Sequence, residues 1–285
     1  MNQGVSLVYN PVDGKPDRMH VGARVLDMHN WIEIDKFYIE DISLKRKLLQ
    51  ERRDRVFVST SEGDAGSKEV LDELLTYLPN RYPNEWATPI SVDPQLHPLE
   101  AASLLVQEDL CLMTQRGQDW VLTAGSICFP SRWDPRDKIG KSLLGIHEPV
   151  PHYDEKIGVA TQSLFDKMSV DRPMWRVNWT IMDTPDLHQP VPVRRADSIT
   201  VTKENLPDHL YFRRERQTLR KFPKSGDILF TIRTYTNTLA QAALDFPEFR
   251  ANLGKTLGGA TPEMIDYKGW VSIMNDMQEW SASAL

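Results

Sequence analysis

The sequence is poor in cysteine. Its 285 residues include only two, Cys111 and Cys128, and neither lies in a CxxC, a CxxCH or another metal-ligand spacing. These spacings support neither a disulfide framework nor a cysteine-bound zinc or iron–sulfur centre within this chain. We therefore expect both thiols to be reduced, as is usual in the cytoplasm.

Long apolar runs and a dominant positive charge are also absent. No segment approaches the roughly 18 consecutive apolar residues of a membrane span, and the first residues do not form a basic region followed by an apolar core. The net charge is −6, and the one strongly basic stretch, residues 213–221, contains Glu215 and alternates with apolar and amide residues. We expect no membrane segment, no export and no nucleic-acid partner.

The composition is that of an ordinary globular protein, with 40% hydrophobic and 26% charged residues. The length allows one large domain, so we treat residues 1–285 as a single domain with extensions at both ends.

Apolar periodicity and turn residues predict an α+β fold. Helices are expected at 67–78, ended by Pro79-Asn80, and at 98–106, 137–146 and 157–168. Strands are expected at 110–114, 120–128, 175–182, 199–202, 210–222 and 228–235. From residue 239 onward the chain is mostly helical, with Gly258-Gly259 between two helices. The result is a central antiparallel sheet with helices inserted midway and added at both ends.

Four stretches carry a family resemblance. They are CFPSRW at 128–133, IGKSLLGIHEPVPHY at 139–153, WRVNW at 175–179 and RRERQTLRKFPKSGDILFTIRTY at 213–235. Together, and in this order, they resemble the heme (alpha) subunit of the heme-dependent oxidative N-demethylase family, which is similar to dimethylamine monooxygenase.

The resemblance implies a PAS-like fold that holds a b-type heme, with an N-terminal extension over about 1–95 and a C-terminal extension over about 239–285. It implies removal of a methyl group from a small secondary amine such as dimethylamine, using dioxygen and releasing a primary amine and formaldehyde. Electrons would come from NADPH through flavin and iron–sulfur centres on a separate reductase subunit. A further subunit would bind tetrahydrofolate.

With this resemblance, His147 is the first candidate for the axial ligand of the heme iron. It follows an apolar run that ends in Ile146, and the prolines after it restrict its backbone. His152 is the second candidate. The alternative is that His147 only caps its helix.

Two other metal arrangements are less favoured. His147-Glu148 and His152 superficially suggest a zinc protease, but the spacing is one residue longer than HExxH, and Pro149 and Pro151 prevent the required helix. Cys128 could supply a thiolate, yet its apolar neighbours indicate an inert core thiol.

Arginine side chains are the expected partners of the heme propionates. The candidates are Arg132, Arg176, Arg214, Arg216 and Arg233. On a strand Arg214 and Arg216 point the same way while Glu215 and Gln217 point oppositely, and one of these faces should line the pocket. Some of these arginines are expected instead to form cross-strand ion pairs.

A cationic amine needs a carboxylate or an aromatic face. Glu215, Trp179 and Tyr235 are the candidates, and Asn178 and Thr231 could donate hydrogen bonds to bound dioxygen or deliver protons. Core packing is the alternative for Trp179.

Two other functions stay open. A PAS-like sensor could bind heme or another small ligand without turnover, since fold alone does not decide function. The chain could also be a structural partner without a cofactor.

Overall fold

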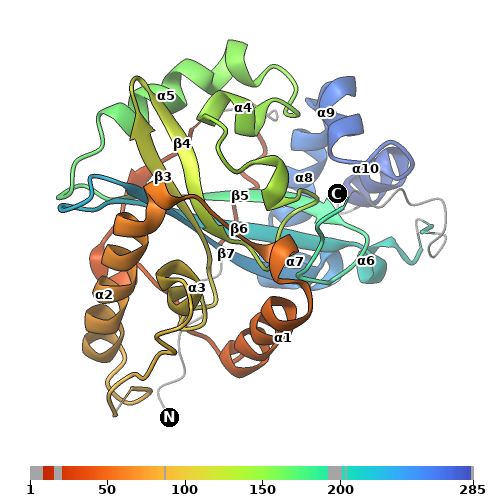
Figure 1. Ribbon diagram of the computed structural model, residues 1–285. Helices are drawn as coiled ribbons and strands as arrows, with labels where there is room; N and C mark the ends of the chain where they lie inside the picture. The colour runs from red at the N-terminus through yellow and green to blue at the C-terminus, as the bar shows by residue number, and fades with distance from the viewer. Residues whose placement is uncertain (1–8, 16–20, 87, 192–200, 203, 284–285) are drawn as a thin grey trace.

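A computed structural model describes residues 9–15, 21–86, 88–191, 201, 202 and 204–283. Its centre is one seven-stranded sheet in the order β1-β5-β6-β7-β3-β4-β2, and every neighbouring pair is antiparallel (Figure 1). The α+β class is confirmed. The strands are β1 Arg24–Val25, β2 Phe57–Ser59, β3 Asp109–Arg116, β4 Asp119–Ser126, β5 Met174–Met182, β6 Tyr211–Lys221 and β7 Ile228–Thr238.

The register divides the side chains of the central strands between two faces. Asn178 lies opposite Glu215, and Glu215 lies opposite Thr234, so these three side chains share one face, which we call the Glu215 face. Arg216 lies opposite Val177 and Arg233 on the other side, which we call the Arg216 face.

Helices cover both faces. Figure 1 shows α1, α2 and α3 together on one side of the sheet, α4 and α5 on the other, and α8 to α10 near the C-terminus. The helices are α1 Tyr38–Val56, α2 Asp64–Arg81, α3 Pro98–Ser103, α4 Leu143–His147, α5 Val159–Asp166, α6 Leu206–His209, α7 Leu239–Asp245, α8 Phe249–Gly258, α9 Pro262–Tyr267 and α10 Met274–Ala282. Short helical turns lie at Met28–Asn30, Ser61–Gly63, Pro135–Asp137 and Asp154–Gly158.

Each helical group closes its own apolar core. Leu74 of α2 packs with Leu112 of β3 on the Arg216 face, whereas Leu143 of α4 and Phe165 of α5 pack with Leu122 of β4 on the other. A third cluster joins the C-terminal helices to the sheet at Phe212.

The predicted hairpins are confirmed. β3 and β4 turn at Gly117, whose φ of 63° suits glycine, and β6 and β7 turn at Gly226, whose φ is 78°. The basic stretch at 213–221 is part of β6. The C-terminal helices also agree, since α8 ends at Gly258.

Helix ends were predicted less well. α2 continues through Pro79 to Arg81, because Tyr77 and Arg81 anchor its last turns by donating hydrogen bonds to the carbonyl of His29 at 3.1 and 2.6 Å. The helix expected at 98–106 ends at Ser103.

Other predicted bounds of helices and strands differ from the observed ones, in one case because a contact with a distant segment replaces the helix. The helix expected at 137–146 begins only at Leu143, because the amide of Gly140 donates to the carbonyl of Leu122 at 2.8 Å and ties the preceding segment to β4. The helix expected at 157–168 is α5, which starts at Val159. Of the strand expected at 199–202, residues 199 and 200 lie outside the described residues, and 201 and 202 are not in a strand.

Helix α1 was not predicted. Its buried side includes Ile42 and Leu49, but also the fully buried Lys45, which interrupts the apolar stripe. A non-helical residue, Arg52, adds a kink with φ −145° and ψ 38°.

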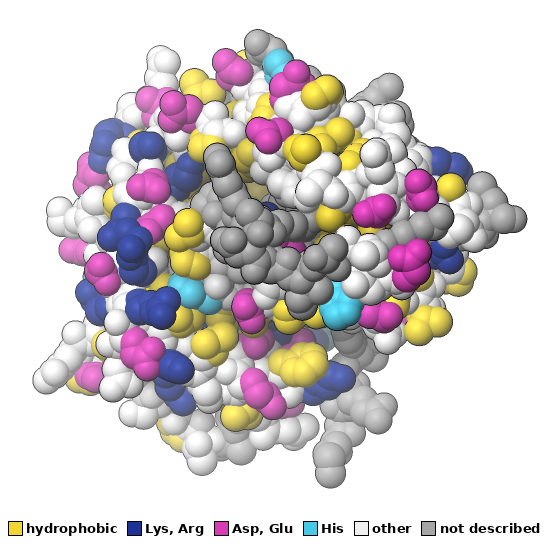
Figure 2. Space-filling model, turned by 90° about the vertical axis from the view of Figure 1, so that its right-hand side faces the viewer, with side chains coloured by type: hydrophobic (Ala, Val, Ile, Leu, Met, Phe, Trp, Pro, Cys, Tyr) yellow, Lys and Arg dark blue, Asp and Glu magenta, His cyan; other side chains and the backbone are white. Residues whose placement is uncertain are grey.

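The surface carries no single-sign patch on the side drawn in Figure 2, where acidic and basic side chains are interspersed. Among the helices in the described part of the chain, none is long and apolar enough to cross a membrane.

A buried carboxyl in the β6–β7 turn gives a first testable prediction. Burial raises the pKa of Asp227 from 3.8 to about 6. The folded protein therefore binds a proton more tightly than the unfolded chain, so this group costs stability as the pH rises from about 4 to 6. We expect Asp227→Asn to raise the free energy of unfolding by about 2 kcal/mol at pH 8.

The gain should vanish below pH 4, where Asp227 is protonated in both states. Urea unfolding at pH 4, 6 and 8 measures it, with Asp72→Asn as the control because Asp72 is exposed and pairs only with Lys68 on α2. A gain that does not change with pH would contradict the assignment.

Candidate functional site

His147 is the last residue of the short helix α4. Ser142 caps this helix by accepting a hydrogen bond from the amide of Gly145 at 3.3 Å, and Pro149 follows soon after its end. The Nδ1 atom of His147 lies 2.8 Å from the carbonyl oxygen of Leu143. The helix thus holds the imidazole by its own backbone.

This contact decides the protonation of the ring. A carbonyl oxygen only accepts, so Nδ1 carries the proton and Nε2 keeps a free lone pair. Burial lowers the pKa of His147, the hydrogen bond to Leu143 opposes this, and the positive charges of Lys138 and Arg176 lower it further. A neutral imidazole with a free Nε2 is the form that binds iron or zinc.

A cavity of about 450 Å³ lies against His147. Leu144, Val150 and Tyr153 also line it. The Tyr153 ring stacks on the imidazole, with centroids 4.2 Å apart and planes 6° apart. Sequence reasoning missed Tyr153, although it ends the same motif that contains His147.

His147, rather than His152 or Cys128, has the surroundings of a ligand. His152 is exposed, with a φ of 58°. Cys128 is fully buried in the core on the Arg216 face, and burial raises its pKa to about 12. In the described part of the chain, no three His, Cys, Asp or Glu side chains gather as a metal site.

Arg176 of β5 lies on the Glu215 face and near His147, whose pKa its charge lowers. Burial lowers the pKa of Arg176, while the charges of Glu215 and Tyr153 oppose this. Its Nε atom is buried and has no hydrogen-bond acceptor. A buried guanidinium with an unused donor is suited to an anionic group of a ligand.

Glu215 is buried at the centre of its face, with 8% of its surface exposed. Its Oε2 atom accepts hydrogen bonds from the amide groups of Asn178 at 3.4 Å and Gln217 at 3.2 Å. Its Oε1 atom lies 3.6 Å from the Nε of Arg213. The predicted residues Glu215 and Asn178 are therefore brought together.

Three of the predicted propionate partners lie on the opposite face. Arg214 and Arg216 bind backbone carbonyls, of Tyr9 at 3.2 Å and Trp31 at 3.1 Å respectively. Arg233 pairs with Asp35 at 2.8 Å and with Asp41 at 3.3 Å. The sheet separates these three side chains from His147.

Three further candidates also lie on the Arg216 face. Tyr235 donates a hydrogen bond to Glu33, and Thr231 lies fully buried with its Oγ1 atom 2.6 Å from that of Thr218. Trp179 stacks on Trp270 of the C-terminal cluster, with centroids 5.9 Å apart, as the core-packing alternative predicts. These side chains are not gathered with His147.

Arg132 belongs to the loop after β4. Its φ of 63° is unusual for a non-glycine residue, and its side chain pairs with Asp183 at 2.5 Å. Its Nε atom is buried without an acceptor. Arg132 shares this unused buried donor with Arg176, but also with Arg213, Arg214, Arg216 and Arg233, so the face on which each side chain lies has to distinguish them.

The donor set fits a heme. The cavity has a mixed lining, in which Leu144, Val150 and Tyr153 lie beside Glu148 and Asp154. A histidine with an unprotonated Nε2, these apolar side chains and a nearby half-buried arginine with an unused donor suit an iron porphyrin with anionic propionates. One family model matches residues 22–277 of the chain, and its description is "Haem-dependent oxidative N-demethylase, alpha subunit-like". The match starts before β1 and ends within α10, so it includes the whole sheet and α4.

Proposed function

The chain belongs to the heme-dependent oxidative N-demethylase, alpha subunit-like family, and we propose that it is the heme-carrying catalytic subunit that demethylates a small secondary amine such as dimethylamine. The products would be a primary amine and formaldehyde. The observation that carries the proposal is the imidazole of His147, held neutral with Nε2 free beside a cavity of about 450 Å³.

His147 would hold the iron of a b-type heme through Nε2. Its Nδ1–H bond to Leu143 fixes the ring orientation, and Tyr153 supports the ring by stacking. Arg176 would bind a propionate, with Arg132 as the second candidate. Bound heme supplies the activation of dioxygen, and the protein sets the ligand, the polarity and the access to the site.

Glu215 would attract the ammonium form of the amine. It is buried and held by Asn178 and Gln217, and a desolvated carboxylate attracts a cation more strongly than an exposed one. Asn178 would orient Glu215 and supply a hydrogen-bond donor for dioxygen. Because Arg214, Arg216, Arg233, Tyr235, Thr231 and Trp179 lie across the sheet or in a core, we assign them structural contacts instead.

The remaining parts of the proposal concern fold and partners. An antiparallel sheet with α4 and α5 inserted between β4 and β5 supports a PAS-like domain, with N-terminal and C-terminal extensions. The alpha-subunit description implies a complex of several subunits. We propose that NADPH-derived electrons arrive through flavin and iron–sulfur centres on a reductase subunit, that another subunit binds tetrahydrofolate, and that the complex is cytoplasmic.

The test begins with the absorbance of the purified protein after addition of hemin, then of dithionite and carbon monoxide. We expect a Soret band that shifts at each step. When dimethylamine, NADPH and the cognate reductase are then added, we expect formaldehyde to form in proportion to the dimethylamine consumed. A Soret band without formaldehyde would favour a sensor, and a protein that takes up no heme would overturn the proposal.

Arg176 gives a prediction that does not depend on turnover. Arg176→Met removes a buried charge without a hydrogen bond at Nε, so we expect the heme-free protein to be as stable as the wild type or more so. The heme-loaded variant should lose heme to excess apomyoglobin about ten times faster, since one propionate contact worth ~1.4 kcal/mol is gone.

The matched control is Arg172→Met, since Arg172 is exposed and precedes β5. Equal rates of heme loss in the two variants would remove Arg176 from the propionate role.

A further inference from the structure

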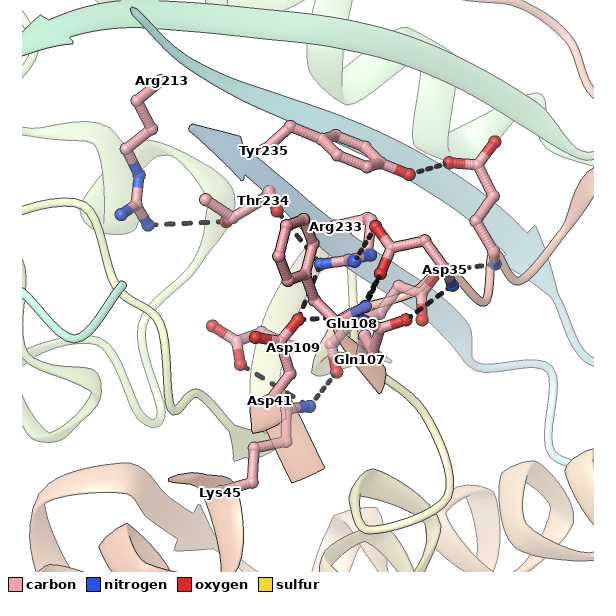
Figure 3. Close-up of polar contacts among 12 residues, drawn as sticks. Asp35, Asp41, Lys45, Gln107, Glu108, Asp109, Arg213, Arg233, Thr234 and Tyr235 are labelled. Carbon is pink, nitrogen blue, oxygen red and sulfur yellow. Dashed lines mark hydrogen bonds and ion pairs between the residues drawn. The ribbon is translucent and has the colours of Figure 1, made fainter. Parts of the chain in front are cut away.

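A line of buried charges crosses the molecule from the start of α1 to the Glu215 face. Figure 3 shows its first part, in which Arg233 lies between Asp35 and Asp41 and also interacts with the fully buried Glu108. Lys45, one turn after Asp41 on α1, interacts with Asp41 and lies 3.9 Å from Asp109 of β3. Lys45 and Asp109 are both fully buried.

The line continues past Asp109. The charges of Asp109 and Arg213 act on each other, and the Nε of Arg213 lies 3.6 Å from Glu215. From Lys45 onward, the charges are therefore Lys45 (positive), Asp109 (negative), Arg213 (positive) and Glu215 (negative). Glu215 is the carboxylate that we propose to bind the amine.

Asp109 and Arg213 are fixed by the backbone. Asp109 accepts hydrogen bonds from the amides of Cys128 at 2.9 Å and Phe129 at 2.8 Å. Both terminal nitrogens of Arg213 donate to backbone carbonyls, one to Leu187 at 3.2 Å and the other to Phe129 at 2.5 Å. Only Nε of Arg213 faces Glu215. Arg213 is therefore held beside Glu215 as an ion pair through Nε alone, while its terminal nitrogens are used by backbone carbonyls.

The neighbouring charges partly offset one another at Glu215. Without other charges, Arg213 and Arg176 would together neutralise Glu215 and leave little attraction for a cation. The negative charge of Asp109 offsets Arg213, and Lys45 in turn limits the effect of Asp109. Buried charges act over longer distances than exposed ones because solvent screens them less.

We propose that Asp109 and Lys45 are positioning residues that set, through Arg213, how strongly Glu215 attracts a cationic amine. This rests on the proposed function, in which Glu215 receives the ammonium group. Asp109 strengthens the attraction, and Lys45 weakens it.

Two substitutions test the proposal because their effects differ in sign. Heme-loaded Asp109→Asn should bind dimethylammonium about tenfold more weakly at pH 8, since a charge effect of ~1.4 kcal/mol is a factor of ten. Lys45→Gln should bind it severalfold more tightly than the wild type. Isothermal titration calorimetry measures both, with 2-propanol as an uncharged ligand of similar size.

The ratio of the affinity for dimethylammonium to the affinity for 2-propanol separates an effect of charge from general damage to the pocket. The control is Asp227→Asn, another buried carboxyl with a raised pKa, in the β6–β7 turn, and it should leave the ratio unchanged. If a single variant folds poorly, the double variant Asp109→Asn/Lys45→Gln removes both charges and should return the ratio towards that of the wild type.

Three outcomes overturn the inference. Weaker binding of both ligands in both variants would show that Asp109 and Lys45 act only on the fold. An unchanged ratio in Asp109→Asn would show that its charge does not reach Glu215. A wild-type protein that takes up heme but does not prefer dimethylammonium would refute the role of Glu215, whereas one that takes up no heme would refute the proposed function itself.

Discussion

His147→Ala should lose the Soret band of the heme-loaded protein, with heme retention reduced at least ~100-fold. Loss of a ligand removes the iron–nitrogen bond, and changes even to groups that only support a ligand cost about 10- to 100-fold in metal affinity. The spectrum and the rate of heme transfer to apomyoglobin measure the effect. Added imidazole should restore the band, because the large-to-small substitution leaves room for it beside the cavity lined by Leu144 and Val150.

His152→Ala is the matched control, since His152 belongs to the same segment but is exposed. It should keep the spectrum. Two variants with equal, unchanged spectra would remove His147 from the role of ligand, and loss of the band only in His152→Ala would transfer that role to His152.

Arg233→Ala should lower the free energy of unfolding by about 3–5 kcal/mol. Arg233 is 2% exposed and pairs with Asp35 and Asp41, so its removal leaves two carboxylates without their buried partner. Urea unfolding of the heme-free protein at pH 7 measures the change. The same test separates a structural arginine from one that holds the cofactor.

Arg116→Ala is the control, because Arg116 forms an exposed pair with Glu62 and should change the free energy of unfolding by less than about 1 kcal/mol. If Arg233→Ala were as stable as the control but lost heme, Arg233 would belong to the cofactor site despite its position on the Arg216 face.

Part of the candidate site could be predicted from the sequence, and part could not. Alternation along β6 correctly separated Arg214 and Arg216 from Glu215, because side chains on a strand alternate whatever packs on them. Alternation does not say which face a distant helix covers. That α4 brings His147 to the Glu215 face depends on the apolar contacts of Leu143, and these join segments far apart in the chain.

The buried ion pairs of Lys45 and Arg233 also could not be predicted from the sequence. Lys45 looks like a solvent-facing residue of a basic segment, so neither α1 nor the contact with Asp109 was predicted. Arg233 lies in a strand with apolar neighbours, where a buried charge needs a partner. Its partners, Asp35 and Asp41, could not be predicted, since they precede it by almost 200 residues.

The sequence alone determined the hairpins, because turn glycines and strand alternation act within a few residues of chain. Its short motifs resemble a known family, and that resemblance made His147 the first candidate. Tertiary packing alone decided the protonation and surroundings of that histidine, the division of the arginines between two faces and the path of buried charge from α1 to Glu215. Those features depend on which distant groups lie within a few ångströms of one another once the sheet has formed, and burial then multiplies their electrostatic effect.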